Sequence, residues 1–203
     1  MKNIIAVTSG KGGVGKSSVS VNLALALQAQ GARVGILDAD IYGPSIPHML
    51  GAPHQRPTSP DNQHITPIKA HGLSANSIGF LMDEDNATIW RGPMASSALS
   101  QLLNETLWDS LDYLVIDMPP GTGDIQLTLS QQIPVTGAVV VTTPQDIALL
   151  DAVKGVSMFE RVSVPVLGIV ENMSMHICSN CGHHEAIFGT GGAEKMAQKY
   201  NVK

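Results

Sequence analysis

The stretch SGKGGVGKSS, residues 9–18, decides the fold of this 203-residue chain. Residues 10–17 match the pattern G-x-x-x-x-G-K-[ST] of a phosphate-binding loop. The apolar residues 3–8 (NIIAVT) predict a buried strand before the loop, and residues 15–30 predict a helix after it, ending at Gly31. This order of strand, loop and helix is typical of a P-loop NTPase.

Strand and helix signals continue to alternate along the rest of the chain. Because the strands are separated by helices of about 10–15 residues, we expect an α/β fold with a mostly parallel central sheet and helices on both faces. A small hairpin is expected within residues 64–80. The other expected elements are strands at 33–37, 112–117, 136–142 and 166–170, helices at 93–107, 124–132, 146–160 and from 191, and a short helix near 45–50.

Composition and charge exclude several classes of protein. Hydrophobic residues make up 43% of the chain but aromatic residues only 4%, so the core consists mainly of aliphatic side chains, as in buried parallel sheets. The net charge of −5 disfavours broad nucleic-acid binding. No apolar run reaches the ~18 residues of a membrane helix, and the first eleven residues are unlike a signal peptide. With only two cysteines, a cytoplasmic location is the simplest interpretation.

The glycine-rich loop predicts how a nucleotide is bound. Its glycines let backbone N–H groups converge on phosphate oxygens, and the following helix adds a partial positive charge. We expect Lys16 to reach the β- and γ-phosphates and the Ser17 hydroxyl to ligate Mg²⁺. The expected nucleotide-binding residues of the loop are Gly10, Lys11, Gly12, Gly13, Val14, Gly15, Lys16, Ser17 and Ser18.

Lys11 is a second lysine inside the loop, which an ordinary phosphate loop does not require. Either it is simply exposed to solvent, or it reaches a phosphate held by a neighbouring subunit, as an arginine finger does.

Aspartates follow two of the predicted strands. Asp117 ends the apolar run YLVID, the position of a Walker B aspartate that holds Mg²⁺. Asp38 and Asp40 follow the strand at 33–37, where carboxylates can face the ligand crevice of an α/β sheet. We expect Asp40 to act in catalysis by orienting water and Asp38 to contact Mg²⁺, partly through water. Capping of a helix or turn is the alternative role for these residues and for Asp124.

Asn172 follows the strand at 166–170. Its amide can pair with an adenine edge, or it can simply form a turn. The chain has no N-K-x-D guanine signature, so adenine is favoured over guanine.

Residues 177–185, ICSNCGHHE, contain both cysteines, Cys178 and Cys181. Two thiolates are half of the four ligands of a typical metal site. A two-fold dimer would bring two such pairs together, giving the four thiolates of a [4Fe–4S] cluster. The alternatives are a Cys₂His₂ zinc site with the neighbouring histidines (176, 183 and 184), a C-x-x-C redox pair, or inert cysteines.

Several motifs in a fixed order resemble one known family. They are SGKGGVGKSS, DADIYGPSIPHMLG (38–51), DMPPGTGD (117–124), TTPQDIALLDAVKG (142–155), and ENMS, CSNCG and IFGTGGAEKMA within 171–197. Together they resemble the Mrp/ApbC family of iron–sulfur cluster carrier ATPases, part of the deviant Walker A group of P-loop proteins.

The resemblance implies roles for individual residues. Lys11 would be the signature lysine that acts across a homodimer, and Asp40 would lie in switch I. Asp117 and Asp124 would lie in or near switch II. The nucleotide would lie close to Asn172 and to the loop that begins at Pro144. The catalytic set would then be Lys11, Lys16 and Asp40, and Cys178 and Cys181 would bind the cluster.

The resemblance also implies a domain organisation. We expect residues 1–203 to form a single P-loop NTPase domain in which residues 172–190 are the cluster-binding loop. The domain would lack both the small N-terminal domain of many bacterial members and the family's final C-terminal elements.

The predicted function is that of an iron–sulfur cluster carrier with slow ATPase activity. It would bind ATP and Mg²⁺, hold a [4Fe–4S] cluster at a homodimer interface, receive the cluster from a scaffold donor and pass it to apo-proteins. Neither nucleic acid nor membrane is expected as a partner. The alternatives are a metal-free positioning ATPase like MinD and ParA, or an ATPase with a structural zinc site. A nitrogenase-iron-protein-like reductase is disfavoured because residues 118–135 contain no cysteine.

Overall fold

The computed structural model describes residues 1–82 and 92–202 of the chain. Its main strands are β1 (Asn3–Ser9), β2 (Val34–Asp38), β3 (Ile68–Ala70), β4 (Leu73–Ser77), β5 (Tyr113–Asp117), β6 (Gly137–Thr142) and β7 (Val166–Glu171). Its helices are α1 (Lys16–Ala29), α2 (Ile46–Met49), the 3₁₀ helix η1 (Ile78–Phe80), α3 (Gly92–Asn104), α4 (Asp124–Gln132), α5 (Asp146–Arg161) and α6 (Gly192–Tyr200).

Seven strands form one sheet in the order β3-β4-β2-β5-β1-β6-β7. Every pair in it is parallel except the edge pair of β3 and β4. The mostly parallel α/β sheet is therefore confirmed. The expected hairpin within residues 64–80 exists as β3 and β4, and β4 also extends the main sheet by pairing with β2.

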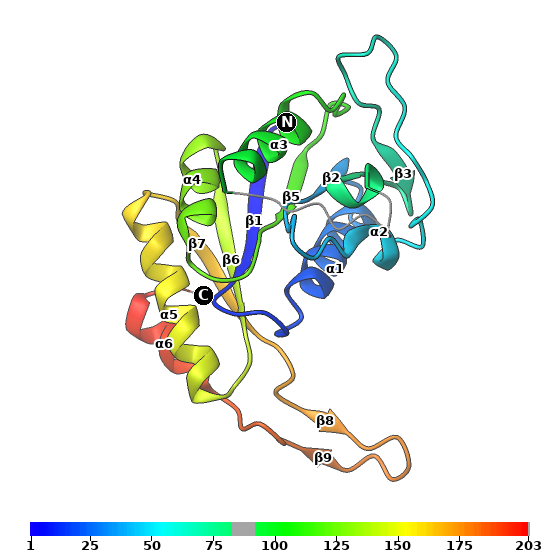
Figure 1. Ribbon diagram of the computed structural model, residues 1–203. Helices are drawn as coiled ribbons and strands as arrows, with labels where there is room; N and C mark the ends of the chain where they lie inside the picture. The colour runs from blue at the N-terminus through cyan, green and yellow to red at the C-terminus, as the bar shows by residue number, and fades with distance from the viewer. Residues whose placement is uncertain (83–91, 203) are drawn as a thin grey trace.

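Helices cover both faces of the sheet (Figure 1) because successive strand residues point to opposite sides. In β5, Leu114 and Ile116 face the core beneath α3, α4 and the end of α5, whereas Val115 faces the core beneath α1 and α2. All three side chains are fully buried. The aliphatic core expected from the composition thus consists of two layers, one on each side of the sheet.

The parallel register brings the functional motifs to one edge. Asp38 and Asp117 lie side by side at the ends of β2 and β5, and Val7 of β1 pairs with Asp117 from the other side. The phosphate loop follows β1 directly, so it begins beside these aspartates. The carboxyl edge of a parallel sheet is where ligands of open α/β folds bind.

A short hairpin lies outside the main sheet. Its two strands are β8 (His176–Ile177) and β9 (His184–Glu185), which pair antiparallel. They belong to the segment between β7 and α6, residues 173–190, which we call the cysteine arm. Figure 1 shows the cysteine arm projecting away from the body. Within the described residues, no helix has both the length and the apolar character needed to cross a membrane.

Candidate nucleotide site and cysteine arm

A pocket of about 220 Å³ lies over the phosphate loop. Loop residues line it together with Asp40, Ser45, Met49 and Pro120. Typical small-molecule pockets measure ~300–1,000 Å³, so this one suits the phosphate groups of a nucleotide rather than the whole molecule.

Two glycines of the loop have no space for a side chain. A Cβ atom on Gly15 would lie 2.2 Å from Nδ2 of Asn172, and Gly15 also has the left-handed φ of +84°. A Cβ on Gly10 would lie 2.3 Å from the backbone carbonyl carbon of Asp151 in α5. The loop is thus packed against α5 on one side and the end of β7 on the other.

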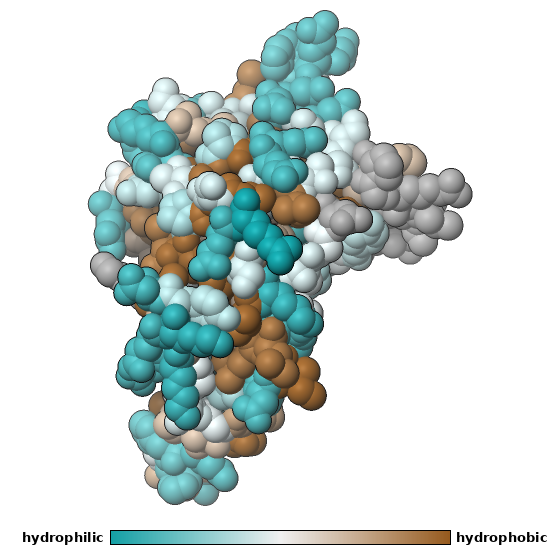
Figure 2. All heavy atoms as spheres, turned by 90° about the vertical axis from the view of Figure 1, so that its left-hand side faces the viewer, coloured by the Kyte–Doolittle hydropathy of each residue, from teal (hydrophilic) through white to brown (hydrophobic). Residues whose placement is uncertain are grey.

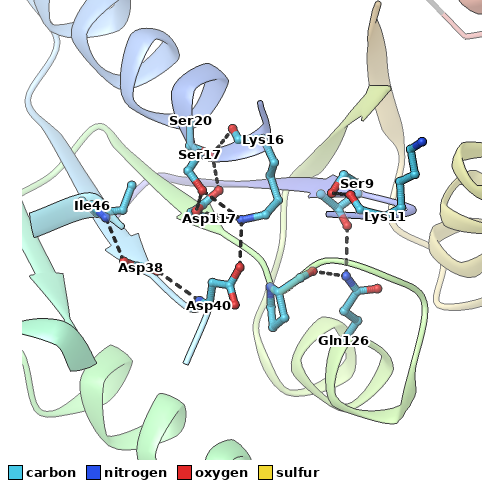
Figure 3. Close-up of polar contacts among 12 residues, drawn as sticks. Ser9, Lys11, Lys16, Ser17, Ser20, Asp38, Asp40, Ile46, Asp117 and Gln126 are labelled. Carbon is cyan, nitrogen blue, oxygen red and sulfur yellow. Dashed lines mark hydrogen bonds and ion pairs between the residues drawn. The ribbon is translucent and has the colours of Figure 1, made fainter. Parts of the chain in front are cut away.

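Lys16 lies at the centre of a buried charge cluster (Figure 3). Its Nζ lies 2.8 Å from Oδ2 of Asp117, 3.6 Å from Oδ2 of Asp40 and 3.3 Å from Oγ of Ser17. Only 6% of the lysine side chain is exposed, and Asp117 is fully buried. Three predicted site residues therefore surround the ammonium group of a fourth, Lys16.

Asp117 accepts hydrogen bonds from two serines of α1. The Ser17 hydroxyl donates to Oδ2 at 2.5 Å, and the Ser20 hydroxyl donates to Oδ1 at 2.6 Å. Sequence reasoning missed Ser20, which is fully buried and lies one helical turn beyond Ser17. Its polar side chain within the apolar run VSVNLALAL was the available signal.

Asp38 is fully buried and organises the loop that follows β2. Its Oδ1 accepts from the backbone N–H of Asp40, and its Oδ2 accepts from the N–H of Ile46, both at 3.1 Å. The Ser77 hydroxyl also donates to Oδ2. Burial, followed by the negative charge of Asp117, raises the pKa of Asp38 to about 7. These bonds place Asp40 beside Lys16, while ligation of Mg²⁺ by Asp38 stays a prediction.

Asp40 is partly buried next to the same lysine. Burial raises the pKa of its carboxyl group, and the positive charge of Lys16 opposes this increase. A catalytic role in orienting water stays a prediction.

Gln126 of α4 is a second residue that sequence reasoning missed. Its Nε2 donates to the Pro119 carbonyl and, at 3.3 Å, to Oγ1 of Thr8. It therefore fastens the segment after β5 to β1, next to the phosphate loop. Asp124 is expected in or near switch II. Its side chain lies outside the described part of the structure.

Three further residues predicted to contact the nucleotide, Lys11, Pro144 and Asn172, lie outside the charge cluster around Lys16. Figure 3 shows the ammonium group of Lys11 pointing away from Lys16 and Asp117. Pro144 is buried in the loop between β6 and α5. The Nδ2 of Asn172 donates to the carbonyl of Val14 at 2.9 Å, so this amide contacts the phosphate loop itself. Recognition of adenine by Asn172 stays a prediction.

The two cysteines lie in the turn of the cysteine arm. Both are free thiols; Cys181 is exposed and Cys178 is half-buried. The turn is closed by the Cys178 N–H donating to the His183 carbonyl at 2.9 Å and the Gly182 N–H donating to the Cys178 carbonyl at 2.8 Å. The backbone N–H of Cys181, then that of Asn180, and then the Cys181 thiol lower the pKa of Cys178. The turn thus stabilises a thiolate, the form that binds metals.

The neighbouring histidines do not complete a metal site around these thiols. Among residues 1–82 and 92–202, no three His, Cys, Asp or Glu side chains gather closely enough to hold a metal ion. The described residues thus place two thiols in this turn, with no third ligand of these types beside them.

A family model described as "ParA: NUBPL iron-transfer P-loop NTPase" matches residues 1–203. The chain belongs to this family. Family membership agrees with the mostly parallel sheet, and it confirms the resemblance inferred from the ordered motifs.

Curated relatives carry names that refer to iron–sulfur clusters. The chain is 96% identical over 203 residues to the iron–sulfur cluster carrier protein of Haemophilus influenzae and 77% identical to that of Escherichia coli K12. It is 51% identical to the iron–sulfur cluster transfer protein NUBPL of Dictyostelium discoideum, covering 63% of that protein. It covers 55% of each of the two bacterial proteins, so it spans about half their length.

Solved structures show the same fold. A nucleotide-binding protein from Archaeoglobus fulgidus, in complex with ADP and with cobalt, is 41% identical with a TM-score of 0.87; the match covers 99% of this chain and 79% of that one. The cell division ATPase MinD of Pyrococcus furiosus has a TM-score of 0.69 at 21% identity, covering 100% and 81% of the two chains. The similarity to MinD concerns the fold alone.

Proposed function

We propose that this chain is the nucleotide-binding part of an iron–sulfur cluster carrier. It binds ATP and Mg²⁺, hydrolyses ATP slowly, and holds a [4Fe–4S] cluster between two copies for transfer from a scaffold donor to apo-proteins. One observation carries the proposal: two thiols lie at the tip of a projecting arm, without a third ligand among the described residues. The names of the curated relatives support iron–sulfur clusters as the cargo.

The ligand count favours a second copy of the chain. A [4Fe–4S] cluster takes four cysteine ligands, and each chain has two. A two-fold axis beside the arm supplies the other two from the same turn of the partner. Each copy then supplies two of the four ligands. The cluster would lie between the two copies, where an acceptor protein can reach it.

Apolar side chains on the cysteine arm also favour a protein partner. Met173, Met175, Ile177, Ile187 and Phe188 are each between 46% and 57% exposed. Figure 2 shows apolar atoms in the lower half of the face it displays, above a mostly hydrophilic lower end. Burying such side chains in an interface is favourable by about 25 cal/mol per Å².

The charge cluster around Lys16 supports nucleotide binding and hydrolysis. Lys16 provides a cation for phosphate oxygens, and Ser17 and Asp117 present adjacent oxygen atoms, the ligand type that Mg²⁺ prefers. Bound Mg²⁺ would supply neutralisation of the charge on the phosphates. Asp40 lines the same pocket, where its carboxylate would orient a water molecule.

In the proposed dimer, Lys11 of one copy acts on the nucleotide bound by the other copy. Its ammonium group points away from the nucleotide site of its own chain. A lysine directed outward from the loop can reach the phosphates bound by a second copy, and its charge would then stabilise the transition state of hydrolysis. Hydrolysis would be slow while the two copies are apart.

The test is anaerobic reconstitution with iron and sulfide, followed by iron, sulfide and mass determination. We expect about four irons per dimer, and Cys178→Ala or Cys181→Ala should abolish cluster binding. His183→Ala in the same turn is the matched control and should retain it. A full cluster in either cysteine variant, or one metal ion held by each monomer, would contradict the proposal.

A further inference from the structure

Both ends of the cysteine arm are attached to two consecutive residues at the end of β7. At the first end, Asn172 donates from Nδ2 to the Val14 carbonyl at 2.9 Å, and its backbone N–H donates to the Thr142 carbonyl at 2.8 Å. At the second end, the Glu171 carboxylate accepts from the N–H of Gly191 at 2.9 Å and of Ala193 at 2.7 Å.

Glu171 closes the base of the arm. Its two oxygens each hold a backbone N–H at the beginning of α6, where the helix dipole favours a negative charge. Hydrogen bonds to a charged acceptor are stronger than those between neutral groups. The strand that leads into the arm and the helix that follows it are thereby fixed to each other.

The first end of the arm is in close contact with the phosphate loop. A Cβ on Gly15 would lie 2.2 Å from the Asn172 amide and 3.8 Å from the terminal methyl of Met173, the first residue of the arm. Met173 has the left-handed φ of +59°, so the chain bends sharply where the arm begins. If phosphate binding reorients the peptide groups of Val14 and Gly15, the contacting residues Asn172 and Met173 would be displaced.

Little packing opposes a movement of the arm relative to the body. Its two strands contain two residues each and are exposed, and the cysteines follow the first strand directly. With little side-chain packing to hold the arm against the body, a rotation at its base moves the tip as well.

We infer that Glu171 and Asn172 couple the phosphate loop to the cysteine arm within a single chain, so that bound nucleotide changes the environment of Cys178 and Cys181. Asn172 transmits a change in the conformation of the phosphate loop to the start of the arm. Glu171 holds the end of the arm against β7. A displacement at the start of the arm therefore rotates its tip and does not separate the two ends of the arm. Both act as positioning residues. The inference builds on the proposed function, because it gives nucleotide a route to the cluster ligands that does not require a second copy.

The test measures thiol reactivity in the metal-free, reduced chain. The rates at which Cys178 and Cys181 react with a maleimide are compared with and without saturating ADP and Mg²⁺, at two protein concentrations to separate effects of dimerisation. We expect nucleotide to change the rate by at least about fivefold in the wild-type chain, the lower end of typical coupling between two sites. The change should be independent of protein concentration.

Glu171→Ala should bind ADP normally and lose this response. The matched control is Glu194→Gln, which removes an exposed carboxylate from the first turn of the same helix and should keep the full response. Asn172→Ala, measured at saturating ADP, should also lose it. If Glu171→Ala does not fold, as judged by circular dichroism, Glu171→Gln retains one acceptor oxygen and should give a reduced response.

Two results would overturn the inference. One is a wild-type chain whose thiol reactivity does not change when ADP is bound. The other is a response of equal size in wild type and in a folded Glu171 variant. Because the assay needs no iron, a failure of cluster reconstitution would count against the proposed cargo and leave this measurement valid.

Discussion

The Nζ of Lys16 lies 2.8 Å from Oδ2 of Asp117, and this ion pair fills the position between the phosphate loop and the end of β5. Both partners are predicted to contact the nucleotide complex, the lysine through phosphate and the aspartate through Mg²⁺. With these predicted contacts, binding would exchange one ion pair within the chain for two ion pairs with the ligand. Affinity for nucleotide depends on how much this internal pair stabilises the empty site.

Replacing Lys16 should affect both stability and binding. Lys16→Ala leaves the buried carboxylate of Asp117 without its cation, which typically costs about 3–5 kcal/mol. We also expect ATP affinity to fall by at least about tenfold, because charge-assisted hydrogen bonds to phosphate are lost. Thermal unfolding and binding of a fluorescent ATP analogue measure the two effects. Unchanged affinity in a folded Lys16→Ala chain would contradict the assigned phosphate contact.

Lys11 should separate binding from turnover. Because its ammonium group points away from its own nucleotide site, Lys11→Ala should keep ATP affinity close to that of the wild type. Steady-state hydrolysis should fall by at least about tenfold if the lysine acts on the partner's phosphates. Phosphate release assays at several protein concentrations measure this. Undiminished turnover would remove Lys11 from the mechanism.

Ser20 should be a positioning residue for Asp117. Ser20→Ala removes a buried donor to Oδ1, and leaving the acceptor unsatisfied should destabilise the chain by about 1–3 kcal/mol. A carboxylate free to rotate should also bind Mg²⁺ less well, so the Mg²⁺ concentration needed for tight ADP binding should rise. Ser20→Thr, which retains the hydroxyl, tests whether the donor matters. An alanine variant with unchanged Mg²⁺ dependence would show that Ser20 serves packing only.

The buried Asp38 should make the empty chain less stable as pH rises. Its ordinary pKa of 3.8 applies to the unfolded chain, whereas burial raises the pKa to about 7 in the folded chain. Between these values the unfolded chain loses the proton and the folded chain keeps it, so unfolding becomes easier from about pH 4 to pH 7, by up to about 4 kcal/mol. Urea unfolding of wild type and Asp38→Asn across this range measures the difference.

Asp112 provides a control of opposite sign. The Lys2 ammonium, followed by the Arg33 backbone and side chain, lowers the pKa of Asp112. Its contribution is therefore present above pH 4 and is lost only as pH falls further. Asp112→Asn should leave the slope between pH 5 and pH 7 unchanged. A parallel pH profile of wild type and Asp38→Asn would contradict the assignment of this slope to Asp38.

The sequence predicted the sheet well because its signals are local. The run NIIAVT and the helix from Lys16 to Ala29 are set by hydrophobic patterning, and their ends by glycines on either side. The parallel pairing of β4 with β2 was not predicted. Its sequence, LSANS, is short and largely polar, and only its position in the sheet buries it.

The missed site residues depend on contacts between distant segments. Ser20 and Asp117 are 97 positions apart, and Glu171 meets the beginning of α6 20 positions later. Ser20 and Glu171 belong to no recognisable spacing pattern, so only the fold reveals which residues they contact. The strands β8 and β9 were missed for a related reason, since two residues are too few for an alternating pattern.

The projecting arm has a consequence for the survival of the protein. A thin, exposed ribbon without a core of its own fits into the cleft of a protease more easily than any packed strand. A cluster and a second copy that cover the ribbon, as proposed above, would shield it from cleavage. Under the proposed function, the resistance of each copy to digestion would then depend on whether a cluster is bound.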